Sequence, residues 1–209
     1  QKVEARNFDI RKTLIKFDNV LNDQRHVIFS QRKNAMDSNQ IFEYSDDFLI
    51  QIIDDLKHLK YLKKSDIKNN DFENKLRSIL GRNYEEPEFE KLILSDENVL
   101  KDEIIKKFKK LREERINLLG VEQSKEIEKR IFLQSIDLNW KSHIQYLEQL
   151  RQVIGLRSYG QRDPLIEYKK EAFNLFENLL NKLKLDFVTI LMNLKVVETP
   201  NKKTDEENQ

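Results

Sequence analysis

The 209-residue sequence predicts an all-α fold, and three observations support that prediction. Leucine, isoleucine and phenylalanine recur at steps of three and four over long stretches, which is the period of an amphipathic helix. Only four glycines and three prolines occur, and they fall where such patterns start or stop. A charged fraction of 36% beside an apolar fraction of 38% suits long, exposed helices over a thin core.

The first predicted helix shows its pattern from Val3 to about Ser30, with one apolar stripe formed by Ile10, Leu14, Phe17, Leu21 and Ile28. At 1.5 Å per residue, a helix of about 33 residues would be about 50 Å long. The polar segment 36–40 is the first break. A second amphipathic helix follows, with a stripe formed by Phe48, Leu49, Ile52, Ile53, Leu56, Leu59 and Leu62.

A short third helix is expected over 69–80, stopped by Gly81, and a loop is expected around Pro87. The next helix has Ser95 as its predicted N-cap, with acidic residues in the first turn where the helix dipole favours them. That helix is expected to end at Gly120.

Two very long helices complete the pattern and should pack as an antiparallel hairpin. The first, over 122–154, carries the stripe Leu133, Ile136, Trp140, Ile144, Leu147, Leu150 and Ile154. The second begins with Asp163 as N-cap and Pro164 at the first position, where a missing N–H costs nothing. Its stripe comprises Tyr168, Ala172, Leu175, Leu179, Leu183, Phe187 and Ile190. About eight residues join the two helices, which fits a hairpin.

Composition and motifs disfavour several functions. The net charge of +1 gives no overall attraction to nucleic acid, and the cluster Lys106, Lys107, Lys109 and Lys110 is interleaved with acids and lacks aromatic partners. Neither cysteine nor a phosphate-binding glycine loop occurs in the sequence. The three histidines should be solvated or at the edge of the core, because they lie on separate helices. Acidic pairs such as Asp46 with Asp47 fit a solvated helix face. We therefore expect no catalytic residue, cofactor or metal here.

The ends of the chain suggest a piece of a longer protein. Gln1 begins in the middle of a helical pattern without an initiator methionine or signal-peptide layout, so we expect the N-terminus to be a cut. The longest apolar stretch is far short of the roughly 20 residues that a membrane-spanning helix needs. Residues 196–209 lack periodicity and should form a disordered linker.

The hairpin connection is the candidate functional site. It carries an aromatic residue, two arginines and hydrogen-bonding groups at the far end of two rigid helices: Leu156, Arg157, Ser158, Tyr159, Gly160, Gln161 and Arg162. Such a tip can press against an extended polypeptide and grip its backbone without reading its sequence. The equally weighted alternative is that Tyr159 folds back over the end of the hairpin. For Trp140, on an apolar stripe, core packing is the favoured role.

Four segments resemble the C-terminal part of the SecA family of bacterial preprotein translocation motors. They are VEARNFDIRK (3–12), FDNVLNDQRHVIF (17–29), IDLNWKSHI (136–144) and LRQVIGLRSYGQRDPLIEYKKEAF (150–173). The resemblance is close over about 1–35 and 125–195, while residues 38–120 match by position alone. At the tip, Arg157-Ser158-Tyr159-Gly160 stands where the family usually has Arg-Gly-Tyr-Ala.

The resemblance implies a long scaffold helix (1–37), an inserted helical wing domain (38–121) and a two-helix finger (122–195). It implies that the tip loop, with Tyr159, reaches the SecY channel and touches the translocating preprotein, and that this region restrains the ATPase of the motor. The nucleotide-binding domains that use ATP and Mg, and the zinc-binding tail, are absent from these residues. The family implies a homodimer in the cytoplasm, peripheral to the inner membrane.

A second reading stays open. The stripe from Ile10 to Ile28 could belong to a free-standing helical adaptor or coiled-coil protein that docks partner helices on it. A third, nucleic-acid binding, predicts an association that weakens steeply with salt.

Overall fold

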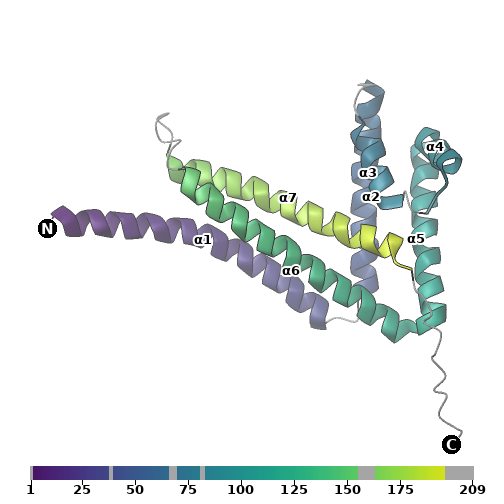
Figure 1. Cartoon of the computed structure of the whole chain (residues 1–209), viewed down its shortest axis with the longest axis horizontal. Coiled ribbons are helices and arrows are strands. Elements are labelled where there is room, and N and C mark those ends of the chain that lie inside the picture. Colours follow the sequence, from purple (N-terminus) through teal and green to yellow (C-terminus); the bar gives the residue numbers. More distant parts are fainter. Residues whose placement is uncertain (1, 38–39, 66–69, 81–82, 155–162, 196–209) are drawn as a thin grey trace, which may run out of the picture.

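The computed structural model describes residues 2–37, 40–65, 70–80, 83–154 and 163–195, and every regular element in those ranges is an α-helix (Figure 1). The predicted all-α fold is therefore confirmed for the described part of the chain. Helices follow where the apolar spacing of three and four residues runs unbroken, and they end at the glycines, prolines and polar segments.

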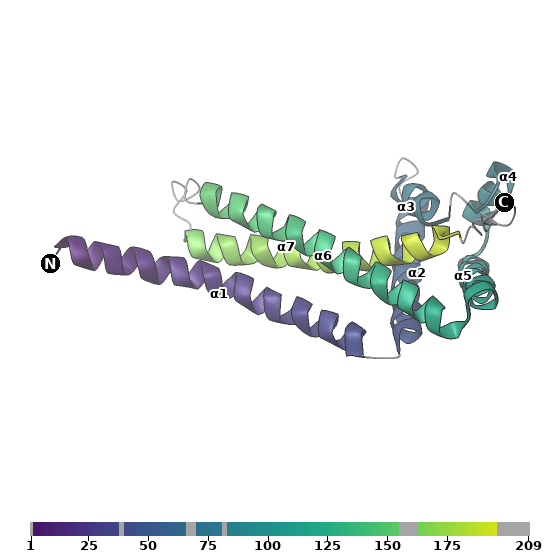
Figure 2. The same ribbon diagram turned by 60° about the horizontal axis from the view of Figure 1, so that its bottom comes forward.

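Three long helices lie side by side. α6 (Val121–Ile154) and α7 (Pro164–Asn193) form an antiparallel pair, and α1 (Lys2–Asp37) runs along it (Figures 1 and 2). The N-terminal part of α1 extends beyond the end of the pair at which α7 begins. The predicted helical hairpin is thus present, with a third helix bracing it.

Four further helices stand across the opposite end of this pair (Figure 1). They are α2 (Ile41–Ser65), α3 (Asp71–Leu80), α4 (Glu86–Leu94) and α5 (Glu97–Leu119). We call them the wing helices. Their hydrophobic core continues into the last turns of α7, where Phe187, Val188 and Leu191 are fully buried. The wing helices and the hairpin therefore share one core, although the division of the chain into domains stays a prediction.

Two local predictions are wrong. Pro87 lies inside α4 and not in a loop, because a proline in the first turn of a helix replaces an N–H that has no partner there. Asp96, and not Ser95, is the N-cap of α5: its carboxylate accepts a hydrogen bond from the Asn98 N–H at 3.2 Å. Ser95 instead follows α4 as its C-cap.

Among the predicted stripe residues whose burial the structure describes, most are buried or half-buried, but three are not; the burial of Ile10 lies outside that description. Leu14 is 40% exposed, Leu62 37% and Ile190 43%. Each sits near an edge of its apolar face, where periodicity alone does not tell a covered position from an open one.

Candidate functional site

The predicted contact residues of the hairpin tip, Leu156 to Arg162, lie outside the described residues. Their two supports are described. α6 ends at Ile154, and α7 begins at Pro164 with Asp163 as its N-cap, since the Asp163 carboxylate accepts a 2.8 Å hydrogen bond from the Leu165 N–H. The cap and the proline confirm the predicted start of α7, and both ends of the tip loop are anchored on rigid helices.

A small core braces the hairpin next to the tip. Phe17 of α1 meets the ring of Tyr168 edge-on, with centroids 4.6 Å apart. The other members of this core are Leu147, Ile154 and Ala172. Burial raises the pKa of the Tyr168 phenol, so it stays neutral. α1 thus supports the hairpin as far as the last turn of α6.

A group of buried hydrogen bonds, which we call the clasp, links α1 to both helices of the hairpin. It lies beside the small core, on the side away from the tip. The Nε2–H of His143 donates to Oε1 of Gln24 at 2.7 Å, and Nε2 of Gln24 donates to the Ala172 carbonyl at 3.0 Å. His143 is only 3% exposed, and burial lowers its pKa from 6.5 to about 4. The imidazole is therefore neutral at pH 7, and the clasp carries no charge.

The other histidines differ from this one. His26 and His58 are exposed, as expected of solvated residues. The expectation is wrong for His143, which is buried with the rings of Trp140 and Phe176 at centroid distances of 5.5 Å and 5.8 Å. Trp140 is 9% exposed and belongs to the main core, which confirms its predicted packing role. The sequence analysis missed this clasp; its one local signal is Gln24, a polar residue on the apolar face of α1 four residues before Ile28.

The lysine-rich face of α5 is mostly solvated. Lys106, Lys109 and Lys110 are exposed, but Lys107 lies over the ring of Tyr84 at 5.3 Å, so the expectation of no aromatic partner is wrong for that residue. Tyr84 is 23 positions away in the sequence, which is why local spacing did not reveal it.

Neither a metal site nor a membrane span emerges from the described part of the chain. No cluster of three or more His, Asp or Glu side chains within it could hold a metal ion. None of the helices in the described ranges combines the length and apolarity that crossing a bilayer requires.

These observations define a class: an all-α protein in which one long helix and a transverse set of four helices support an antiparallel hairpin. Residues 1–195 match the family described as the SecA Wing and Scaffold domain. The chain belongs to this family, as the resemblance had implied.

Three curated relatives carry the SecA name. The chain is 66% identical over 200 residues to "Protein translocase subunit SecA" of Pelagibacter ubique, covering 96% of this chain and 23% of that protein. It is 39% identical to the protein of the same name from Caulobacter vibrioides, with 94% and 22% covered. It is 41% identical to "Protein translocase subunit SecA 1" of Rhodopseudomonas palustris, with 94% and 21% covered. The chain thus spans roughly a fifth of the length of these relatives.

Proposed function

We propose that this chain is the scaffold, wing and two-helix finger part of a SecA-type protein translocase. It carries no catalytic residue of its own and transmits ATP-driven motion of other domains to a preprotein in the SecY channel. The tip loop, with Tyr159, makes the contact with the moving polypeptide or the channel, and the same region restrains the ATPase between rounds of translocation.

The observation that carries this proposal is the length of the hairpin below the tip and its packing against a third long helix. α6 and α7 have 34 and 30 residues. They are braced along one side by α1 through the Phe17–Tyr168 contact and the Gln24–His143 clasp. A force applied at the wing end is then delivered at the tip without being lost in bending. The family membership and the names of the relatives supply the substrate class.

The adaptor alternative fits the packing less well. It requires the apolar stripe of α1 to be free for a partner helix, yet Phe17 is 8% exposed and Ile28 only 1%, both buried within this chain. The part of the stripe from Phe17 to Ile28 is already covered within this chain, where α1 packs on α6 and α7, so a partner helix cannot dock there.

The partners that follow from the proposal are the preprotein, the SecY channel complex and the nucleotide-binding domains of the complete motor, which supply ATP and Mg. The complete protein would act as a homodimer, in the cytoplasm and peripherally attached to the bacterial inner membrane. Nucleic acid is not among the proposed partners.

The test is photo-crosslinking in the complete translocase. A photoreactive amino acid at Tyr159 should form adducts with preprotein or channel subunit during ATP-driven translocation. The matched control carries the same amino acid at Leu94, which is 85% exposed and is the last residue of α4. α4 lies at the opposite end of the hairpin from the start of α7 (Figure 1). Capture of neither partner from Tyr159, or equal capture from both positions, would overturn the proposal.

A further inference from the structure

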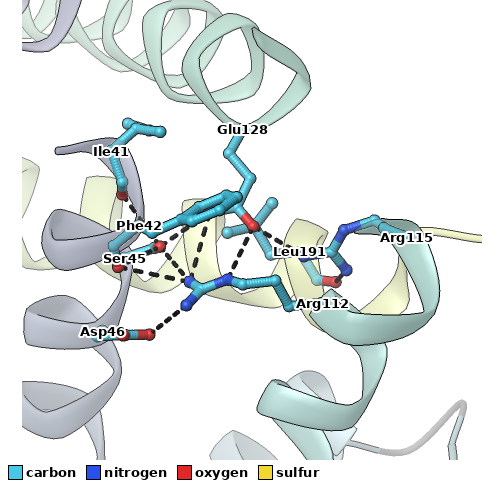
Figure 3. A network of polar contacts seen from close by, with 8 residues as sticks. All are labelled: Ile41, Phe42, Ser45, Asp46, Arg112, Arg115, Glu128 and Leu191. Carbon is cyan, nitrogen blue, oxygen red and sulfur yellow. Dashed lines mark hydrogen bonds and ion pairs between the residues drawn. The ribbon is translucent and has the colours of Figure 1, made fainter. Parts of the chain in front are cut away.

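A buried group of charges lies where the wing helices meet the base of the hairpin (Figure 3). Glu128 of α6 is completely buried, at 0% exposure, and two arginines of α5 reach it, Arg112 and Arg115, which are 8% and 3% exposed. Ser45 and Asp46 of α2 complete the group, which we call the base cluster. An enclosed carboxylate has to find strong partners within the protein, because water is not available to it.

Glu128 is the shared acceptor of the base cluster. Its Oε1 accepts from Arg115 Nη2 at 2.8 Å and from Arg112 Nε at 3.2 Å. Its Oε2 accepts from the Ser45 hydroxyl at 2.9 Å. Every one of these donors comes from α2 or α5 and none from α6 itself. The carboxylate therefore holds its own helix against two wing helices at once.

The two arginines extend the cluster to a fourth helix and to the surface. Arg112 donates to Asp46 Oδ1 at 2.8 Å and to Ser45 Oγ at 2.6 Å. Arg115 donates to the Leu191 carbonyl of α7 at 3.2 Å. Asp46 thus has an ion-pair partner, in contrast to the solvated pair expected from the sequence. Two arginines and two carboxylates balance, so the cluster has no net charge to bring in an outside ion.

The connection between α5 and α6, beside the base cluster, places little constraint on the backbone. A single residue, Gly120, separates α5 from α6, with a φ of 83° that glycine adopts freely. A side chain built at this position would meet nothing within 4 Å. Gly120 therefore constrains the angle between the wing helices and the hairpin less than another residue would, so side-chain interactions have a larger part in setting that angle.

Stability alone is a weak reason for such a cluster. Burying ions costs solvation, and apolar residues of similar volume often give an equal or greater stability. The cluster is also incompletely paired: Arg115 Nε and the hydroxyl of Ser124, one turn before Glu128, are buried without a hydrogen-bond partner among the described residues. Hydrogen-bonded ion pairs, however, are directional, whereas apolar contacts tolerate sliding.

We propose that the base cluster is an orientation latch in which Glu128 is a positioning residue that selects one angle between the wing helices and the hairpin. Glu128 does so by accepting directional hydrogen bonds from Ser45 of α2 and from Arg112 and Arg115 of α5, and these bonds cannot all form at another angle. This goes beyond the proposed contact at the tip and does not depend on it.

Spin-label distance measurements on the whole chain test the latch, and the absence of cysteine makes labelling straightforward. One label replaces Tyr61 of α2 and the other Tyr146 of α6, which are 67% and 59% exposed. The parent pair should give one narrow distance distribution. Glu128→Gln should broaden it or shift its maximum, because the negative charge between the two arginines is lost and an amide NH2 donor replaces one of the two acceptor oxygens. A reference pair at Tyr61 and Leu94, both on wing helices, should not change.

A second variant keeps the test decisive if Glu128→Gln does not fold. The triple replacement Glu128→Leu, Arg112→Met and Arg115→Met removes the buried charges together, which buried ion clusters often tolerate without loss of stability. The latch predicts a folded chain with a broader distribution between the wing helices and the hairpin. An unchanged narrow distribution in the triple variant would overturn the proposal, because apolar packing would then select the angle alone.

Discussion

Trp140 and Tyr146 are aromatic residues of one helix in opposite surroundings. Trp140 is 9% exposed in the main core, whereas Tyr146 is 59% exposed. Trp140→Ala should lower the free energy of unfolding by about 3–5 kcal/mol, the usual cost of truncating a buried aromatic residue. Urea unfolding followed by circular dichroism measures it.

Tyr146→Ala is the matched control, with an expected change within about 0.5 kcal/mol because little packing is lost at an exposed position. Similar costs for the two variants would mean that Trp140 is not part of the core.

His143 predicts a pH dependence of stability. Its folded pKa is about 4, below the ordinary 6.5, so the unfolded chain binds this proton more readily than the folded chain between those values. The stability contributed by the neutral ring is complete above pH 6.5 and is lost as pH falls toward 4. At 1.36 kcal/mol per pKa unit the loss amounts to about 3 kcal/mol.

Comparing unfolding free energies of the parent chain and His143→Gln isolates this effect, because glutamine does not titrate while the carboxylates remain in both. The difference between the two should narrow steadily from pH 7 to pH 4.5. A difference independent of pH would contradict the depressed pKa.

At the scale of elements, the N-cap of α7 gives a testable contribution to helix stability. The Asp163 carboxylate caps α7 through the Leu165 N–H. Asp163→Ala should cost about 1 kcal/mol and speed amide hydrogen exchange in the first turn of α7, next to the tip loop. Asp163→Asn keeps a capping oxygen and should behave like the parent chain. Equal damage from both substitutions would argue for a role of the negative charge other than capping.

Element prediction succeeded where caps and periodicity agreed and failed where they competed. Asp163 and Pro164 opened α7 as expected. Around Pro87 the sequence predicts a loop, but α4 forms there with Phe89 and Leu92 buried in the main core. A nine-residue helix is too short to be stable by itself, so its existence depends on that packing.

At the scale of the whole molecule, the proposed function predicts that substitutions of Tyr159 affect translocation without affecting folding. Tyr159→Ala should change the free energy of unfolding by no more than about 0.5 kcal/mol if the tip carries little packing. Placed in the complete translocase, the same substitution should impair preprotein translocation. Tyr159→Phe, which keeps the ring, tells whether the aromatic surface or the hydroxyl matters.

A large fall in melting temperature for Tyr159→Ala would instead favour the reading in which this side chain folds back on the hairpin. Normal translocation with an unchanged melting temperature would remove Tyr159 from the proposed contact.

The sequence by itself determined that the chain is helical, where the hairpin begins and ends, and which family it resembles, because these depend on spacing, caps and motifs within a few turns. Tertiary structure alone decided that His143 is enclosed against Gln24, 119 positions away, and that Glu128 gathers donors from α2 and α5. Burial and charge pairing depend on which distant segments pack together. The helical period of one segment does not tell which other segment it will contact.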